Sequence, residues 1–306
     1  MLCVRRCFDA RAFEFRIGSS LGITKRHRVV AASLDGDCVL DPSLMPHEVD
    51  PRRPYLVVVL DGALHLRRRG EAMERGSAIF CKSRSWLNEH ERMVALGGYR
   101  AIMLHVDRAL LPSPRATKVH RLARGALAIS ATLHDALASG APSRDIERAQ
   151  DAFVDAMRRS GIPMPARELL RQAVPTEDTH LSLALGSSLS MVAGNPAIVD
   201  VTSVLSLAER TARRRLARIA DDYGLAYPRW QTLRQKWRLA VAALMLTLPD
   251  ATPEGVRSEV AFASTATLCH ALRREGLPSP RVIQQRAEAV RRALGGASGA
   301  SLPHRR

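Results

Sequence analysis

The chain has 306 residues, 46% of them hydrophobic and only 4% aromatic, and its 46 Lys and Arg against 30 Asp and Glu give a formal net charge of +16. This length allows two domains with aliphatic cores, and the charge favours a polyanionic partner such as nucleic acid. No apolar run reaches the ~18–20 residues of a membrane span, which excludes a membrane-spanning protein, and the five cysteines show neither a CxxC pair nor zinc-finger spacing. These features predict a cytoplasmic protein without a metal or other cofactor.

Short apolar runs separated by turn residues predict a β-rich sensor or association domain at residues 1–115. Asp61-Gly62 predicts a hairpin, since glycine supplies the positive φ of a tight turn. Cys3 and Cys7 are compatible with a redox pair, but we expect a frayed N-terminus there. Many short strands at this spacing are typical of a jelly-roll or cupin-like barrel, whose mouth can bind a small molecule. The expected strands are 28–34, 55–60, 63–68, 77–82 and 99–106.

The histidines of this half test the main alternative, a cupin-type metal-dependent enzyme with a helical appendage. Catalytic cupins usually carry two histidines one residue apart, followed by a glutamate, whereas the histidines here stand singly. Alternation with apolar neighbours directs His65 toward the barrel interior, as it does His105. Singly placed histidines are expected to be core or surface residues, so no metal ligand is assigned. The histidines considered as possible ligands are His47, His65, His90 and His105.

Residues 116–179 predict a helical connector. Apolar residues recur at steps of three and four from Leu122 to Leu137, and again from Ile146 to Met157, so each run forms one face of a helix. The Gly- and Pro-containing segment 140–143 separates the two runs. The two helices are expected to pair against the sheet, with a dimer seam as the alternative, and residues 173–179 to form a linker.

An arginine-rich segment at 205–220 is the centre of the C-terminal half. Ser206 followed by Glu209 has the spacing of a capping box. On a helix, the apolar side chains of Ala212, Leu216 and Ile219 lie on one face. The opposite face carries Arg210, Arg213, Arg214 and Arg218. Because a short helical run at 198–205 precedes this segment, it predicts a helix-turn-helix motif, which lays its second helix in a DNA major groove.

A second helix-turn-helix motif is expected at residues 253–274, with Ser264 as the cap of its second helix. The side chains that would face DNA are those of Ala266, Thr267, His270, Arg273 and Arg274. An apolar stripe from Trp230 to Leu244 predicts the helix that connects the two motifs. About 20 residues of helix at 1.5 Å each would hold the motifs about 30 Å apart, close to the ~34 Å between successive major-groove faces.

Residues from about 181 to 286 resemble the double helix-turn-helix domain of the AraC/XylS family of transcription regulators. The run from Arg210 to Leu216 is similar to that family's first recognition helix, and 227–230 to the start of its connecting helix. The run from Phe262 to Pro280 follows its second signature. The departures include Ala261 at a usual glycine, Leu268 and Leu272 at usual phenylalanines, and Ala208 at a usual serine.

The resemblance implies a sequence-specific, DNA-binding transcription regulator of α+β class and no enzyme, with the DNA-binding domain at 180–286 and a flexible basic tail at 287–306. Its expected partners are double-stranded DNA, a small effector bound by the N-terminal domain, a second copy of the chain, and RNA polymerase. The residues expected to contact DNA are Arg210, Arg213, Arg214, Arg218, Thr267, His270, Arg273 and Arg274. A sensor protein that has lost DNA binding remains a third interpretation, because of the departures in the second motif.

Overall fold

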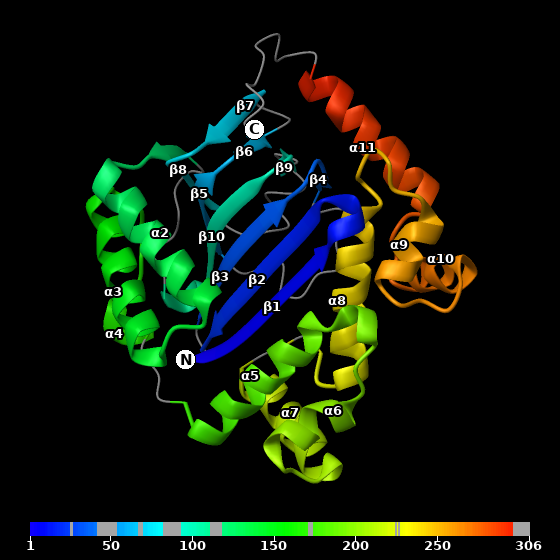
Figure 1. Ribbon diagram of the computed structural model, residues 1–306. Coiled ribbons are helices and arrows are strands. Elements are labelled where there is room, and N and C mark those ends of the chain that lie inside the picture. The colour runs from blue at the N-terminus through cyan, green and yellow to red at the C-terminus, as the bar shows by residue number, and fades with distance from the viewer. Residues whose placement is uncertain are drawn as a thin grey trace.

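The computed structural model describes residues 1–24, 27–41, 54–66, 70–81, 93–110, 118–170, 174–223, 225 and 227–295. Its N-terminal part is an antiparallel β domain of two sheets, ordered β1-β2-β3-β10-β5-β8-β11 and β4-β9-β6-β7 (Figure 1). The strands are β1 (Leu2–Ala10), β2 (Phe15–Ile23), β3 (His27–Asp35), β4 (Val39–Leu40), β5 (Tyr55–Asp61), β6 (Ala63–Leu66), β7 (Glu71–Glu74), β8 (Ser77–Cys81), β9 (Met93–Leu96), β10 (Tyr99–Val106) and β11 (Val119–Arg121). The predicted fold class, a β domain followed by a helical part, is confirmed.

The first strand corrects the expectation of a frayed N-terminus. β1 pairs with β2 along its whole length, from Leu2 opposite Ile23 to Ala10 opposite Phe15. Cys3 and Cys7 both lie on this extended strand, where four residues span about 13 Å at ~3.3 Å each. Since a disulfide joins Cα atoms less than about 7 Å apart, the two cysteines cannot form a redox pair within this strand.

The Asp61-Gly62 turn does not close a hairpin between paired strands, so that prediction is wrong. β5 belongs to the long sheet and β6 to the short one, and the turn is the corner at which the chain passes between them. Gly62 has a φ of +72°, and a side chain there would overlap the carbonyl oxygen of Gly98 at the adjoining corner. The Asp61-Gly62 turn therefore carries the chain from the long sheet to the short one.

The predicted connector helices pack on the β domain. α2 (Arg124–Ser139) and α3 (Ser143–Arg159) lie against one another, and α2 contacts β2, β3 and β10. Leu133 and Leu137 of the first stripe, and Phe153 and Met157 of the second, are buried in a core shared with the long sheet. Both stripes are thus used inside the chain. The short helix α4 (Arg167–Leu170) follows.

The remaining helices are α5 (Thr176–Ser190), α6 (Ile198–Leu205), α7 (Glu209–Asp222), α8 (Trp230–Met245), α9 (Pro253–Glu259), α10 (Thr265–Arg274) and α11 (Pro280–Gly295). Two predicted boundaries need correction. The expected linker at 173–179 already contains the start of α5, and the expected tail from 287 is helical through Gly295. Ala287 and Val290 of α11 are buried against Val39 and Val94, which explains why this helix continues.

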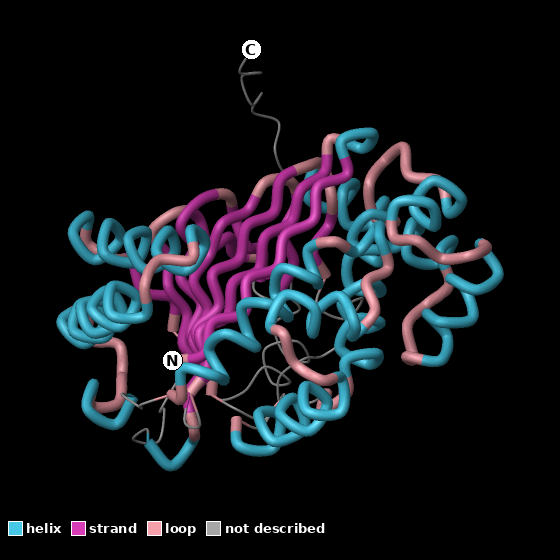
Figure 2. Tube along the Cα trace, turned by 60° about the horizontal axis from the view of Figure 1, so that its bottom comes forward, coloured by secondary structure: helices cyan, strands magenta, loops and turns pink. Residues whose placement is uncertain are grey.

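The β domain and the C-terminal helices share one hydrophobic cluster. It includes Leu2 of β1, Leu185 of α5 and Val241 of α8. In Figure 1, α2, α3 and α4 lie on one side of the long sheet, α5 to α7 at its lower end and α8 to α11 on the other side. Figure 2 shows the same strands side by side with helices flanking them. Within the described ranges, no helix is long and apolar enough to cross a membrane.

Candidate nucleic-acid interface

The first helix-turn-helix unit consists of α6 and α7, but its capping differs from the prediction. Ser206 is the C-cap of α6, with a left-handed φ of 51°, and the residue before α7 is Ala208, which makes no side-chain cap. Glu209 is the first residue of α7, where its negative charge is favourable at the positive end of the helix dipole. The predicted capping box of Ser206 and Glu209 is therefore wrong, although the helix and its turn are present.

The arginines of α7 lie on its exposed face, as the helical periodicity predicts, while Ala212, Leu216 and Ile219 are buried. They nevertheless differ in their contacts. Arg213 pairs with Glu209 one turn earlier on the same helix, and Arg218 pairs with Asp178 of α5. Among the residues that the structure describes, Arg210 and Arg214 make no hydrogen bond or ion pair.

The Arg218–Asp178 pair joins α7 to α5. The side chain of Asp178 is only 2% exposed, whereas that of Arg218 is half exposed. If Arg218 left this pair, the buried carboxylate of Asp178 would lose this ion-pair partner, which costs free energy. Arg215 makes a parallel contact, with its Nη2 2.9 Å from Glu177 Oε2, also on α5. These two arginines hold α7 in place, which the local sequence pattern did not reveal.

An open groove of about 850 Å³ lies between α6, α7 and the start of α8. Its cationic lining comes from Arg213 and Arg214 of α7, Arg234 of α8 and the preceding Arg229. Arg234 is fixed, because its Nη1 donates to the carbonyl oxygen of Pro196 at 2.6 Å. The groove adjoins the exposed arginine face of α7, and its lining arginines extend the positively charged surface toward α8.

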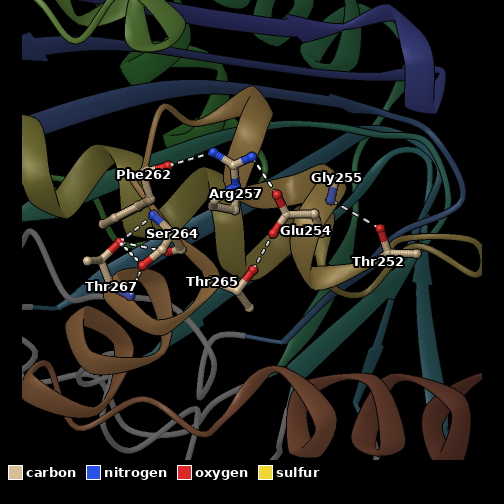
Figure 3. A network of polar contacts seen from close by, with 8 residues as sticks. All are labelled: Thr252, Glu254, Gly255, Arg257, Phe262, Ser264, Thr265 and Thr267. Carbon is tan, nitrogen blue, oxygen red and sulfur yellow. Dashed lines mark hydrogen bonds and ion pairs between the residues drawn. The ribbon is translucent and has the colours of Figure 1, made fainter.

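The second unit consists of α9 and α10, and its predicted cap is confirmed. Ser264 Oγ accepts from the backbone N–H of Thr267 at 3.1 Å, and Thr267 Oγ1 accepts from the N–H of Ser264 at 3.0 Å (Figure 3). Glu254 of α9 accepts from the hydroxyl of Thr265 at 2.5 Å, which joins the two helices. Leu268, Ala271 and Leu272 are buried, as expected.

The outward face of α10 carries Thr267, His270, Arg273 and Arg274, all exposed. The hydroxyl of Thr267 is already used in the cap, so its polar atom serves the helix first. Both arginines lie in the last turn of α10. The first half of this helix therefore offers small side chains, and its positive charge is at the far end.

Of the two described histidines that the sequence directs into the barrel, only His105 is a core residue. His105 is buried and its ring stacks on that of Tyr55, with centroids 4.6 Å apart. His65 lies on β6 in the short sheet, where its neighbours Leu64 and Leu66 are buried and His65 is only partly buried, so the expected inward orientation is wrong for this residue. His47 and His90 fall outside the described residues. In the part of the chain that the structure describes, no three His, Cys, Asp or Glu side chains gather as a metal site would require.

No family model and no curated protein sequence matches the chain. The solved structures similar to it include the following three. A variant of apo ToxT from Vibrio cholerae has 9% identity and a TM-score of 0.33, over 85% of this chain and 98% of that one. ToxT with an unsaturated fatty acid bound has 9% identity and a TM-score of 0.31, over 86% and 96%. The AraC-like transcriptional activator CuxR has 12% identity and a TM-score of 0.30, over 72% and 79%.

Proposed function

We propose that this protein is a sequence-specific DNA-binding transcription regulator of the AraC/XylS type. The observation that carries the proposal is the exposed arginine face of α7, in a helix-turn-helix unit that is followed by a second one. A helix in this setting enters the major groove and reads base edges with its N-terminal residues. The resemblance of residues 181–286 to the AraC/XylS reader supports the same function.

The arginines of α7 divide into two roles in this proposal. Arg210 and Arg214 make no hydrogen bond or ion pair among the described residues and would bind guanine edges or phosphates. Arg213 would join them at little cost, because its pair with Glu209 is a surface pair worth about 0.5 kcal/mol or less. Arg218, in contrast, keeps its contact with buried Asp178 and positions the helix, so we no longer assign it to DNA.

In the second unit, His270, Arg273 and Arg274 would bind mainly the phosphate backbone. The two arginines lie in the last turn of α10, whereas a recognition helix reads base edges mainly with its N-terminal residues. The β domain would supply control, through a small effector or through association with a second copy, and the regulator would act in the cytoplasm, with RNA polymerase as its functional partner. The division at residue 115 is part of the same proposal, and the reader is extended to include the whole of α5 and of α11.

Binding of the purified chain to an operator mapped in its own genome tests this function. We expect Arg210→Ala and Arg214→Ala each to weaken operator binding by about 1–3 kcal/mol if the lost contact is bidentate to a base. The matched control is Arg121→Ala, which removes an equally exposed arginine from β11. Operator affinity that is unchanged in both α7 variants, or equally reduced in the control, would contradict the assignment.

The salt dependence of binding is a second readout of the same experiment. A protein that neutralises Z phosphates shows a slope of about −0.9Z in log K against log salt concentration. We expect a steep slope for the wild type and a shallower one for Arg273→Ala. A slope near zero would mean that the arginine faces are only solvated surface.

A further inference from the structure

Arg238 of α8 is a buried arginine that contacts the segment leading into the first helix-turn-helix unit and the turn of the second unit. It is 6% exposed. Its Nη1 donates to the side-chain oxygen of Asn195 at 3.1 Å, just before α6 in the first unit. Its Nε donates to the carbonyl oxygen of Val260 at 2.9 Å, and its Nη2 to that of Ala261, both in the α9–α10 turn of the second unit.

The contacts of Arg238 use the planar fork of the guanidinium, which a lysine or a neutral side chain lacks. The guanidinium carbon also lies 4.2 Å from the centre of the Phe262 ring, in the same turn. Burial lowers the pKa of Arg238 to about 10, with a smaller contribution from Arg234 nearby, so the group stays charged at neutral pH. A buried charge is retained at a cost unless it is well hydrogen-bonded, and here its donors reach two separate parts of the chain.

Neighbouring cations of α8 reach one unit each. Arg234 donates to the carbonyl oxygens of Asn195 and Pro196 at 3.2 and 2.6 Å, in the first unit only. Lys236 pairs with Glu275 at the end of α10, in the second unit only. Among the described cations of α8, Arg238 is the one whose side chain joins both.

We propose that Arg238 is the positioning residue that fixes the second recognition helix relative to the first, and so sets the half-site spacing that the protein accepts on DNA. This inference rests on the proposed function. The connecting helix α8 has 16 residues and spans about 24 Å, shorter than the about 20 residues and about 30 Å that the sequence predicts, and it alone sets the separation of the units. The rotation of the second unit about the end of α8 is a separate degree of freedom, and the contact of Arg238 with the α9–α10 turn restricts it.

Rigid positioning has a measurable consequence. Binding of one unit presents the other at a high effective concentration only where the second half-site lies at the matching distance and angle. One inserted base pair moves that half-site by about 3.4 Å and turns it by about 35°. A rigid pair of units loses its second contact on such DNA, whereas a loosely joined pair keeps much of it.

The test uses the full chain and three duplexes: the operator, the operator with one base pair inserted between half-sites, and the operator with its second half-site scrambled. We expect the insertion to weaken wild-type binding about tenfold or more, and binding by Arg238→Met by about threefold or less. Only the first unit can read the duplex with the scrambled half-site. The affinity of Arg238→Met for this duplex is therefore expected to stay within about twofold of the wild-type affinity for it. Arg238→Lys keeps the charge without the planar fork. The inserted base pair is expected to weaken its binding by a factor between those for the wild type and Arg238→Met.

Arg257→Met is the matched control. Arg257 donates to the carbonyl oxygen of Phe262 at 3.1 Å and so supports the same turn from within the second unit, without contacting α8 through that bond. It is expected to weaken the second contact while leaving the spacing preference intact. If Arg238→Met still rejects the inserted base pair as wild type does, or if Arg257→Met relaxes the preference equally, the positioning role of Arg238 is overturned.

A measurement without DNA separates this inference from the proposed function. Spin labels at exposed Ala217 of α7 and exposed Ala266 of α10 report the distance between the recognition helices, in a background with Cys3, Cys7 and Cys269 replaced by serine. We expect a narrow distribution in the wild type and one at least about twice as wide in Arg238→Met, because the buried fork no longer links the units. An unchanged width overturns the inference. A wild type that does not distinguish operator from fully scrambled DNA overturns the proposed function, even where the label distribution behaves as expected.

Discussion

At the scale of single residues, Ala261 carries a local strain in the turn between α9 and α10. Its φ is +56°, a left-handed value that costs a residue with a Cβ about 1–2 kcal/mol. Glycine adopts this conformation freely but loses more entropy on folding, by about 0.4–1 kcal/mol. We therefore expect Ala261→Gly to raise the free energy of unfolding by about 0.5–1 kcal/mol in urea denaturation. Ala263→Gly, two residues later and without a positive φ, should lower the free energy of unfolding. If both substitutions change this free energy in the same direction, Ala261 is not strained.

Residue roles followed from the sequence only where the partner was close in the chain. Ser264 caps α10 because its side-chain oxygen accepts from the backbone N–H of Thr267, only three residues away, which the sequence displays directly. Ser206 and Glu209 show similar spacing, yet Ser206 ends α6 in a left-handed conformation, and no local signal separates the two cases. Periodicity predicted the exposed face of α7, but the partner of Arg218 lies forty residues earlier. Arg238 escaped prediction because arginines are almost never fully buried unless paired.

At the scale of elements, the contact of α5 with β1 depends on a glycine. A Cβ at Gly186 would lie 2.5 Å from the carbonyl oxygen of Arg5 and 2.8 Å from its nitrogen, so helix and strand backbones approach closely there. Alanine favours a helix interior over glycine by about 1 kcal/mol, yet displacing a packed backbone costs about 1–3 kcal/mol. We expect Gly186→Ala to lower the free energy of unfolding despite its higher helix propensity.

The control is Gly125→Ala in α2, where a Cβ would meet nothing within 4 Å. This change should be neutral or stabilising by up to about 1 kcal/mol, from helix propensity alone. Both variants are compared by urea denaturation of the full chain. If Gly186→Ala stabilises the protein as much as Gly125→Ala does, α5 is not held against β1 as the structure has it.

Elements with a strong period and clear breaks were predicted closely, and their partners were not. α6 and α10 occupy the expected residues, as does β10. β1 was missed because its charged and apolar residues do not alternate cleanly: Arg6 is buried, with its guanidinium 4.4 Å from the ring centre of Trp237 on α8. The Asp61-Gly62 signal fixes a turn but not the sheet that the next strand joins, since pairing is decided by residues far along the chain.

At the scale of the whole molecule, the reading half and the β domain are joined by a common core. Arg28 of β3 is 1% exposed and its Nη2 donates to the carbonyl oxygen of Tyr223, at the end of α7, at 3.1 Å. The end of α7 is thus held from the β domain by a buried strand residue. An effector that shifts β3 would act directly on α7, in keeping with the proposed control by the β domain.

This shared core predicts that the full chain melts in a single cooperative transition, with calorimetric and van't Hoff enthalpies in agreement. Arg28→Ala leaves a cavity and the Tyr223 carbonyl without this donor, so we expect it to lower stability by about 3 kcal/mol, a shift in Tm of about 5 °C for a chain of this length. The control Arg148→Ala removes a well-exposed arginine of α3 that is 3.6 Å from Asp145. Its effect should stay below about 0.5 kcal/mol. Two resolved transitions in wild-type calorimetry, or an Arg28→Ala variant that melts like Arg148→Ala, would mean that the β domain and the reader fold independently and that contact through Arg28 does not couple them.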